Sequence, residues 1–532
     1  MSSNRREFIK QLGAGTAGAG LLLGFSGYLF GQPTYTKSLR RSTSPEAQGM
    51  DSAGIINFLD AVAQSKHEFH SLMILRHGQV VAEGWWNPYR PDLRHTLYSM
   101  SKSFTSTAIG LAVHEGRLTV DDKVISFFPD KLPAQVSENL AALRVRDLLS
   151  MSVGHEKDST AEIRTEDDWV RKFLSLPIKY QPGTRFLYNS GATYMLSAIV
   201  QKLTGQRVVE YLKPRLFDPL GIEGMDWERD PKGIDTGGWG LRVRTEDLAK
   251  FGQLYLQKGQ WNGKQILPKA WVEEATSFKI QQPIPANNPD AKEKSDWLQG
   301  YCYQFWRCRH NAYRGDGAFG QYTIVMPDQD AVIAITSETS NMQGQLDLIY
   351  EHLLPAMQAK PLSANTKTAG TLKTRLAALS LPPLPPQKTS PVAAKVSGQT
   401  FKVADNALKV QSVAFQFGKD NCTITLKDDK DTYPITVGLG QWKEGVTSLP
   451  GTPPNLVVTP VRNILSAKVA ASGTWKDENT FEMLWRYIES THHDQVTCHF
   501  EGDKVRLRFR NSMVAMNPNA KDARPELLGQ LV

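Results

Sequence analysis

The chain is organised around one eight-residue stretch, Tyr98-Ser99-Met100-Ser101-Lys102-Ser103-Phe104-Thr105. Ser99 and Lys102 form an S-x-x-K pair that opens an apolar, alanine-rich run, and Gly116 is expected to end the helix that this run forms. Since residues three apart share one face of a helix, the lysine ammonium is expected beside the serine hydroxyl. The stretch therefore predicts a buried helix with a serine at its first turn and a lysine one turn further on.

This pair of residue types suits nucleophilic catalysis. A serine hydroxyl becomes a good nucleophile when a neighbouring base accepts its proton, and a lysine at low dielectric can lose its own proton and act as that base. The first turn of a helix also presents backbone N–H groups that have no partner within the helix. About one or two S-x-x-K matches arise by chance in a chain of this length. The next two turns carry no charged residue, which favours Ser99 as a functional serine.

Length and composition indicate a globular protein with several domains. At 532 residues the chain is too long for a single core, and about two to four domains are expected. Hydrophobic residues make up 40% of the chain and charged residues 22%, as in soluble globular proteins. The formal charge of +8 is scattered, without a run of Lys and Arg. This pattern argues against nucleic-acid binding and predicts only a mild attraction to anionic surfaces.

The N-terminus carries an export signal. Residues 4–10, Asn-Arg-Arg-Glu-Phe-Ile-Lys, match the twin-arginine signature, and a Gly/Ala-rich, weakly apolar run follows from Leu12 to Phe30. We expect a signal peptide over 1–32 and a periplasmic or otherwise extracytoplasmic protein. No A-x-A cleavage site follows, so an uncleaved anchor stays open as the one expected membrane contact. No cysteine follows either, which argues against a lipoprotein.

Four cysteines are too few for a disulfide scaffold. Cys302 and Cys308 lie six apart in a strand-like run, where a bridge would need a hairpin between them. Cys422 and Cys498 fall in separate strand-like segments of the C-terminal region. They are expected either to pair across a sheet or to stay buried as free thiols.

The first large domain, expected over 45–357, has an α+β pattern. Strand-like segments at 71–75 and 79–83 flank Arg76-His77-Gly78, which is typical of a β-hairpin. Helical segments fill the middle of the domain, and strands return at 298–306, 321–326 and 331–336 around the segment Arg314 to Gly320. This order predicts an antiparallel sheet whose first and last segments meet, with helices packed around it.

Two further regions follow. Residues 358–396 are rich in Ser, Thr, Lys and Pro and are expected to form a partly extended linker. Residues 397–532 alternate strand-like runs with turns, which predicts a small antiparallel barrel or sandwich. The segment His492-His493-Asp494, with His499, fits no closed zinc set and is interpreted as a polar hairpin turn. No metal and no cofactor are expected.

Several motifs of the first domain, taken in order, resemble a known family. They are Ser99-Met100-Ser101-Lys102, Leu148-Leu149-Ser150-Met151, Pro182-Gly183-Thr184, Tyr188-Asn189-Ser190-Gly191, and Gly240-Leu241 followed by Asp247-Leu248-Ala249. As an ordered set they are similar to the serine β-lactamase-related hydrolases: class C β-lactamases, D-alanyl-D-alanine carboxypeptidases, D-aminopeptidases, esterases and 6-aminohexanoate-dimer hydrolases. The resemblance covers roughly residues 45–357. It implies a β-lactamase/penicillin-binding-protein-like sheet flanked by helices.

The resemblance also implies roles for individual residues. Ser99 would be the acylated nucleophile, Lys102 its proton partner, and Tyr188 a second base whose phenol pKa is lowered by Lys102. The backbone N–H groups of Ser99 and Ala318 would form an oxyanion hole. The residues expected to contact substrate are Asn189, Ser190, Gly315, Asp316 and Gly317.

Two departures from the family pattern affect the expected substrate. Gly315 stands where the family has a Lys or His that holds a substrate carboxylate. The family's Y-x-N motif has its asparagine two residues after the tyrosine, but here Asn189 directly follows Tyr188 and Ser190 occupies the asparagine position. Arg314 could supply the missing cation. Asp316 could recognise a substrate amine, although a turn residue is the favoured interpretation. Both departures fit an esterase or amide hydrolase better than a β-lactamase or cell-wall peptidase.

The sequence thus predicts an exported serine hydrolase acting on an ester or amide bond of a small molecule or short peptide. His95 and His155 are expected near the site entrance, without a part in the reaction. One alternative is an inactive protein on the same fold that binds cell-wall-type ligands, and another is a true β-lactamase or D,D-peptidase. The C-terminal β-domain is expected either to shade the active site or to serve as a scaffold.

Overall fold

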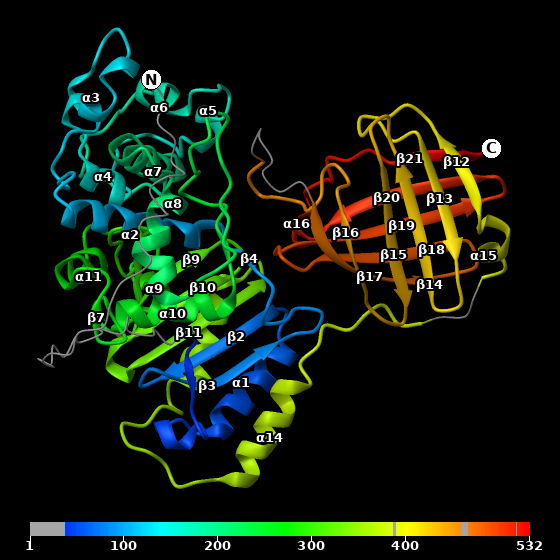
Figure 1. Ribbon diagram of the computed structural model, residues 1–532, viewed down its shortest axis with the longest axis horizontal. Helices are drawn as coiled ribbons and strands as arrows, with labels where there is room; N and C mark the ends of the chain where they lie inside the picture. Colours follow the sequence, from blue (N-terminus) through cyan, green and yellow to red (C-terminus); the bar gives the residue numbers. More distant parts are fainter. Residues whose placement is uncertain (1–37, 387–389, 459–465, 518) are drawn as a thin grey trace, which may run out of the picture. The chain divides into compact units, whose positions relative to one another are not determined.

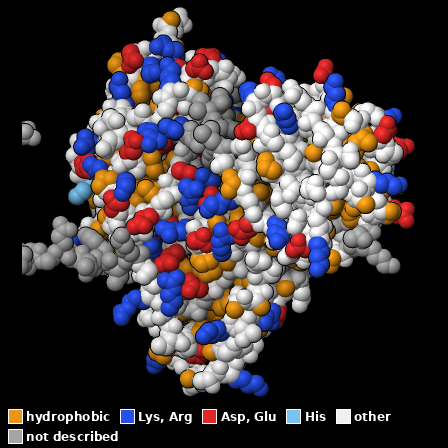
Figure 2. Space-filling view, turned by 45° about the vertical axis from the view of Figure 1, so that its right-hand side comes forward, with side chains coloured by type: hydrophobic (Ala, Val, Ile, Leu, Met, Phe, Trp, Pro, Cys, Tyr) orange, Lys and Arg blue, Asp and Glu red, His pale blue; other side chains and the backbone are white. Residues whose placement is uncertain are grey.

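The computed structural model describes residues 38–386, 390–458, 466–517 and 519–532 (Figure 1). The signal segment predicted over 1–32 lies outside the described residues. Within the described ranges, no helix is both long and apolar enough to cross a membrane. Positive and negative side chains are interspersed over the face shown in Figure 2, in keeping with a scattered charge.

A seven-stranded sheet forms the centre of the first domain. The predicted hairpin is present as β2 (Glu68–Arg76) and β3 (Gln79–Trp85), and β2 pairs on its other side with β11 (Ala331–Glu338). The first and last strand segments of the domain therefore meet, as predicted. The order across the sheet is β1-β3-β2-β11-β10-β9-β8. The other strands are β1 (Arg40–Arg41), β8 (Trp306–Arg307), β9 (Tyr313–Gly317) and β10 (Gln321–Met326).

Helices cover both faces of this sheet because its strands are apolar on both sides. Alternate residues of β2, β10 and β11 pack against α1 (Ser52–Gln64), α13 (Met342–Leu348) and α14 (Thr366–Ala377) in one hydrophobic core. The intervening residues face α10 (Thr245–Leu256). Gly252 of α10 has no side chain, so Val332 and Thr323 of the sheet pack directly against this helix.

The helical part centres on α2 (Ser101–His114) and α7 (Ser190–Thr204), which pack together. A 3₁₀ turn, η2 (Tyr98–Met100), leads into α2, which is buried from Ser101 to Ala112. Gly205, in the left-handed conformation, ends α7. The other helices here are α3 (Glu138–Ala142), α4 (Val145–Leu149), α5 (Thr160–Ile163), α6 (Trp169–Ser175), α8 (Val208–Leu212), α9 (Asp218–Leu220), α11 (Lys269–Thr276) and α12 (Ala291–Lys294).

Two local predictions were wrong. The segment 298–306 is largely irregular and contributes only the start of β8, while β9 includes Arg314–Gly317, which we expected to be a connection. Glycine and aspartate favour turns, but β9 is buried along its whole length, and tertiary packing overrides that preference.

The segment 358–396 contains two helices in addition to its proline-rich part. Helix α14 packs against α1 and β3, and Gly84 of β3 leaves room for Leu376 and Leu379. A second helix, α15 (Pro391–Val396), leads into the C-terminal domain. Much of the segment is thus held against the first domain, because the leucines of α14 and the residues after it supply an apolar face that proline content does not reveal.

Over its described residues, the C-terminal domain is a closed β-barrel of nine strands, antiparallel except for the parallel pairing of β15 with β17. A sheet of ten strands closes on itself when β15 pairs with β17, which leaves β16 outside the ring. The strands are β12 (Gln399–Val403), β13 (Ser412–Phe417), β14 (Asn421–Lys427), β15 (Thr432–Leu439), β16 (Lys443–Thr447), β17 (Ala467–Trp475), β18 (Thr480–Tyr487), β19 (His493–Glu501), β20 (Lys504–Asn511) and β21 (Leu527–Leu531), with α16 (Ser512–Met516) after β20.

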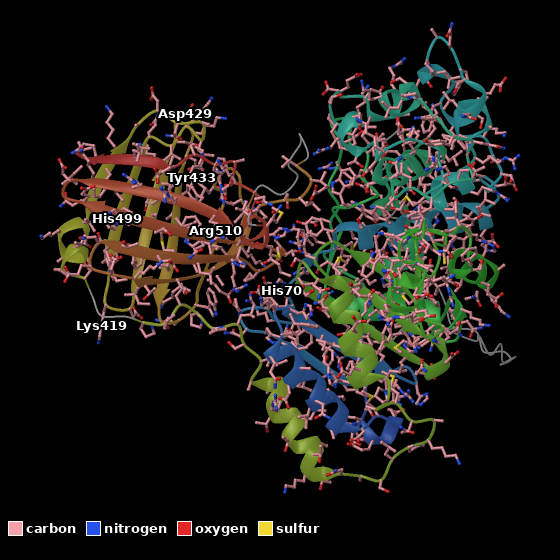
Figure 3. All side chains as sticks on the ribbon, turned by 180° about the vertical axis from the view of Figure 1, so that it is seen from behind. His70, Lys419, Asp429, Tyr433, His499 and Arg510 are labelled. Atoms are coloured by element: carbon pink, nitrogen blue, oxygen red, sulfur yellow. The ribbon has the colours of Figure 1, made fainter. Side chains whose placement is uncertain are left out.

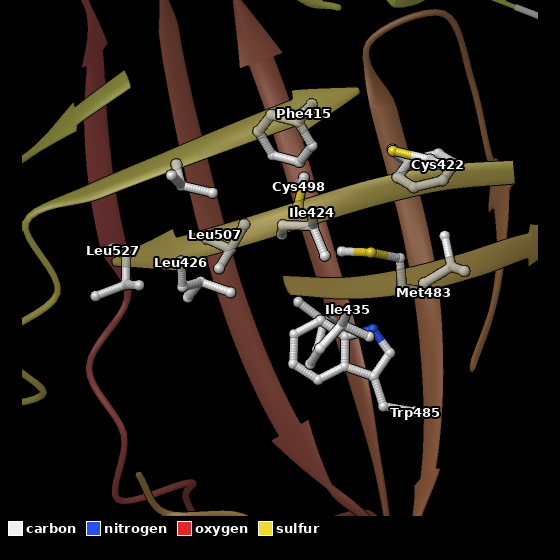
Figure 4. Close-up of a cluster of buried hydrophobic side chains, with 14 of the residues drawn as sticks. Phe415, Cys422, Ile424, Leu426, Ile435, Met483, Trp485, Cys498, Leu507 and Leu527 are labelled. Carbon is white, nitrogen blue, oxygen red and sulfur yellow. The ribbon is translucent and has the colours of Figure 1, made fainter. Parts of the chain in front are cut away.

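The barrel interior is filled by apolar side chains from alternate strand positions. Phe415, Ile424, Met483 and Trp485 are among the side chains of this core (Figure 4). Cys422 and Cys498 lie in the same core, and both are free thiols. Cys302 and Cys308 are also free and buried. The fold of both domains therefore rests on packed cores.

Candidate functional site

The structure brings Ser99 and Lys102 together as the S-x-x-K spacing predicts. Lys102 is buried, and its Nζ lies 3.0 Å from Ser99 Oγ. The same Nζ lies 3.0 Å from Ser190 Oγ and donates a 2.7 Å hydrogen bond to the carbonyl oxygen of Gly238. Ser99 itself is partly exposed. A buried amine is thus held against a hydroxyl that solvent and substrate can reach.

Burial sets the protonation state of Lys102. It disfavours the charged ammonium and lowers the pKa of Lys102 from 10.5 to about 7, although the carboxylates of Asp158 and Asp316 act in the opposite direction. Near neutral pH a large fraction of the amine is therefore unprotonated and able to accept a proton from Ser99. The role of Lys102 as the proton partner of Ser99 stays a prediction.

Tyr188 lies in the same site, but its predicted pKa change was wrong. Burial and the nearby carboxylate of Asp316 raise the pKa of Tyr188 above its usual value. A hydrogen bond with Ser99 acts to lower this pKa, but its effect is smaller. Lys102 Nζ lies 4.8 Å from the centre of the Tyr188 ring, and the ring stacks on Trp306 at 5.6 Å. The phenol therefore stays protonated, which suits a proton donor and not an anionic base.

Asn189 and Ser190 have different roles: Asn189 holds the backbone at the start of α7, and Ser190 contacts Lys102. Asn189 is fully buried and caps α7, because its Oδ1 accepts hydrogen bonds from Gly191 N and from the Ser159 backbone and hydroxyl. Its Nδ2 bonds His155, so the predicted contact of Asn189 with substrate was wrong. Ser190, in the slot of the family's asparagine, is the side chain that contacts Lys102.

The glycines of β9 let this strand lie directly against the turn that carries Ser99. A Cβ on Gly317 would stand 1.9 Å from the carbonyl oxygen of Leu97, and one on Gly315 would stand 2.3 Å from Met100 Sδ. No larger side chain fits at position 315 without moving Met100. The absence of a lysine or histidine there is therefore built into the packing.

Asp316 and Arg314 form a buried ion pair on the opposite face of β9. Arg314 Nε donates to Asp316 Oδ2 at 2.9 Å, and the guanidinium stacks on Trp297 at 4.3 Å. Burial raises the pKa of Asp316, while Arg314 and Lys102 act to lower it. The interpretation of Asp316 as a turn residue was wrong, since it lies in a strand and interacts electrostatically with Lys102 and Tyr188. Arg314 does point inward, but its charge is already paired.

Ala318 follows β9 and is partly exposed, as Ser99 is. The close approach of Gly317 to Leu97 puts the backbone after β9 next to η2. Two bulky residues flank the two predicted oxyanion donors: Tyr98 precedes Ser99 with φ 48°, and Phe319 follows Ala318 with φ 66°. Both have the left-handed backbone that non-glycine residues rarely adopt.

His95 and His155 are both buried, so the expectation that they lie near the site entrance was wrong. His155 bonds Asn189, and burial lowers the pKa of His155 to about 4. His95 Nε2 lies 2.9 Å from Nδ1 of His70, a residue of β2 that is labelled in Figure 3.

A turn of the barrel contacts the first domain next to Ser99. This contact was not predicted from the sequence. The turn between β18 and β19 places His492 against Tyr98, with 2.7 Å between His492 Nε2 and Tyr98 Oη. Earlier in the same turn, the Glu489 carbonyl oxygen accepts a hydrogen bond from the Thr96 N–H at 3.2 Å. The predicted polar hairpin turn was only partly right, since His492 lies in the turn but His493, Asp494 and His499 belong to β19. Nothing in the local pattern indicates a partner 394 residues away in the chain.

The same turn belongs to a buried polar network. Arg486 of β18 pairs with both carboxylate oxygens of Glu68, at 2.5 and 2.9 Å. Within the described ranges, Glu68, Glu338 and His493 form one group whose possible metal-ligand atoms lie within 4.8 Å of one another. Because the guanidinium occupies Glu68 and two histidines bond Glu338, this group is an ion-pair network joining sheet and barrel.

Comparisons with known proteins agree on one family. The family model described as Beta-lactamase matches residues 60–354. A 6-aminohexanoate-dimer hydrolase of Paenarthrobacter ureafaciens is 28% identical over 284 residues, which cover 49% of this chain and 71% of that protein. An N-acetylmuramyl-L-alanine amidase of Bacillus subtilis is 27% identical over 297 residues, covering 45% and 66%. The octameric penicillin-binding protein homologue from Pyrococcus abyssi matches with a TM-score of 0.48 and 17% identity, covering 90% of this chain and 100% of that one.

Proposed function

This chain belongs to the β-lactamase family of serine hydrolases, and we propose that it cleaves an ester or amide bond through an acyl-enzyme on Ser99. The observation that carries the proposal is the buried Lys102 amine, 3.0 Å from Ser99 Oγ and with its pKa lowered to about 7. Such a group is a base at neutral pH beside a hydroxyl that substrate can reach.

Acylation begins when Ser99 Oγ attacks the substrate carbonyl carbon and its proton passes to the neutral amine of Lys102. The carbonyl oxygen becomes an oxyanion, which accepts hydrogen bonds from the backbone N–H groups of Ser99 and Ala318. Ser190 and the Gly238 carbonyl oxygen hold the Lys102 amine in line for this transfer. Donors fixed in advance need no rearrangement as the charge develops, which is their main contribution to rate.

Collapse of the tetrahedral intermediate breaks the bond to the leaving group, which needs a proton. Tyr188 is suited to donate it, because its raised pKa keeps the phenol protonated and its hydroxyl bonds Ser99. The proton that Lys102 took from Ser99 then restores the phenol. In deacylation a water molecule attacks the acyl carbon, gives its proton to the Lys102 amine, and releases the acid and the Ser99 hydroxyl. Protons balance over the two steps.

We further propose that the substrate has no carboxylate beside the cleaved bond. Position 315 has no room for a cation, and the Arg314 charge is neutralised by Asp316. These features favour an esterase or amide hydrolase over a β-lactamase or D,D-peptidase. The relative named 6-aminohexanoate-dimer hydrolase supports the amide branch.

The test is the intact mass of the protein after brief exposure to a nitrophenyl ester, with a penicillin in parallel. We expect an acyl adduct on the parent and none on Ser99→Ala. Ser106→Ala is the matched control, because Ser106 lies on α2, the helix that follows Ser99, is fully buried, and its Oγ has no hydrogen-bond partner. An adduct that persists in Ser99→Ala would refute the role of Ser99. A folded parent that neither forms an adduct nor hydrolyses either compound would favour the alternative, an inactive ligand-binding protein.

We propose export through the twin-arginine route on the sequence of residues 4–10 alone. Replacing Arg5 and Arg6 together by lysine is expected to keep the protein in the cytoplasmic fraction of the producing bacterium. Retained export in that double variant would refute this proposal without affecting the hydrolase.

A further inference from the structure

We propose that His492, a residue of the barrel, is a positioning residue for the oxyanion hole of the first domain. The inference rests on the proposed acyl-enzyme function. It assigns the C-terminal domain a part in the reaction, where the sequence left open whether that domain shades the site or serves only as a scaffold.

His492 is fully buried between three groups that fix its orientation. Its Nε2 lies 2.7 Å from Tyr98 Oη, and its Nδ1 lies 2.5 Å from Glu338 Oε1 and 3.2 Å from Ser512 Oγ. Burial alone would raise the pKa of Glu338, but hydrogen bonds and charge from His492 and His493 lower it to about 2, so this carboxylate accepts hydrogen bonds. His492 therefore donates from Nδ1 to Glu338, at the end of the central sheet.

The hydroxyl of Tyr98 completes this chain of hydrogen bonds. Burial raises the pKa of Tyr98, so the phenol stays protonated. The N–H of Leu456, from the barrel, points to Tyr98 Oη at 3.5 Å. The Tyr98 hydroxyl thus accepts from the barrel backbone and shares a hydrogen bond with His492 Nε2. Both partners of this hydroxyl come from the C-terminal domain.

The two aromatic rings that pack against the His492 ring belong to the residues that flank the predicted oxyanion donors. The ring lies 4.6 Å from Phe319, edge to face, and 5.8 Å from Tyr98, and those two rings lie 5.7 Å apart. Tyr98 immediately precedes Ser99 and Phe319 immediately follows Ala318, both with left-handed backbone. Such a backbone costs conformational free energy and persists only where the surroundings hold it.

His492 packs against both strained residues and is itself anchored to the sheet through Glu338. The direction of the Ser99 N–H follows from the backbone of Tyr98, since the two residues share one planar peptide unit. The Ala318 N–H belongs to the peptide unit shared with Gly317, and Phe319 holds the chain directly after this donor. Loss of the His492 contacts is therefore expected to misalign the Ser99 donor directly and to loosen the segment that carries the Ala318 donor. Substrate binding, which does not require this alignment, should change little.

The test compares two replacements that keep different halves of the contact. His492→Asn retains an amide near Nδ1 for Glu338 but is too short to reach Tyr98, whereas His492→Gln can reach Tyr98. For the nitrophenyl ester we expect kcat to fall about 10- to 100-fold in His492→Asn with KM within about 3-fold, and His492→Gln to recover part of the loss. His499→Gln is the control, since His499 is exposed on β19 of the barrel (Figure 3).

The diagnostic measurement is the infrared carbonyl frequency of the acyl-enzyme, made with a carbonyl-labelled ester. Hydrogen bonds from the oxyanion donors lower this frequency, so it should rise in His492→Asn and in Tyr98→Phe, which removes the same bond from the other side. If a replacement of His492 prevents folding, Tyr98→Phe alone tests the inference, because phenylalanine retains the aromatic ring that packs against His492.

A parent acyl-enzyme together with unchanged kcat and carbonyl frequency in the folded variants would overturn the role of His492 and leave the proposed hydrolase standing. A parent that forms no acyl-enzyme with the ester would overturn both. A fall in kcat without a frequency change would mean that His492 only stabilises the fold, which also contradicts the inference.

Discussion

Replacing Lys102 by methionine is expected to stabilise the folded protein near neutral pH while it abolishes acylation. The lysine is buried and its pKa is lowered from 10.5 to about 7, so the unfolded chain binds a proton that the folded protein tends to release. The free energy of unfolding must then decrease as the pH is lowered from above the pKa of Lys102 in the unfolded chain to its pKa in the folded protein. Below the pKa in the folded protein, the contribution of Lys102 is constant. Methionine fills a similar volume and carries no such cost.

The magnitude follows from the two pKa values. At about pH 7 a lowering from 10.5 to about 7 corresponds to about 4 kcal/mol of stability lost through Lys102. At about pH 9.5 the same relation gives only about 1.5 kcal/mol. Methionine also loses the hydrogen bonds to Ser99, Ser190 and the Gly238 carbonyl oxygen, at about 1 kcal/mol each, but that loss does not depend on pH in this range. The stability of the variant relative to the parent should therefore decrease by about 2–3 kcal/mol from neutral to alkaline pH.

The assay is urea unfolding of the parent and Lys102→Met at both pH values, with the difference between the two proteins taken at each. Taking the difference removes the contributions of every other titrating group that the two proteins share. A difference that is constant across this range would refute a lowered pKa for Lys102, and with it the base in the proposed mechanism. Parent kcat should rise with pH about a midpoint near 7 in the same range.

Three other substitutions test separate parts of the structure. Tyr188→Phe should lower kcat about 10²- to 10⁴-fold at nearly constant KM in ester hydrolysis, because it removes the proton donor, and an unchanged kcat would exclude that role. Arg486→Met should lower the free energy of unfolding by about 3 kcal/mol, since it leaves the half-buried Glu68 carboxylate without its cation. Arg508→Met, in an exposed pair with Glu526, should cost less than about 1 kcal/mol. Gly317→Ala should lower the free energy of unfolding by about 3 kcal/mol or more, because the added Cβ would stand 1.9 Å from the Leu97 carbonyl oxygen. Gly370 of α14 has open space around it, so Gly370→Ala should be neutral or stabilising. In each pair, equal effects on unfolding would contradict the reasoning.

The parts of the site that could be predicted are those encoded by residues close together in sequence. The S-x-x-K spacing fixes the position of Lys102 beside Ser99, because one helical turn separates them. The pKa of Tyr188 could not be predicted, since it depends on burial and on Asp316, which comes from a different strand. Asp316 was interpreted as a turn residue because glycines flank it, yet those glycines serve to bring β9 against η2.

The local elements follow from the sequence: the β2–β3 hairpin, the helix after Ser99, the alternation of the C-terminal strands, and the motif order that identifies the family. Hydrophobic period and turn residues are sufficient for these, since they act over a few residues. Tertiary contacts were needed to show that Ser190 holds Lys102, that Arg314 neutralises Asp316, and that a barrel histidine contacts the residue before Ser99. These pairings join distant segments through packing and burial, and neither the direction of a buried side chain nor its pKa follows from its neighbours along the chain.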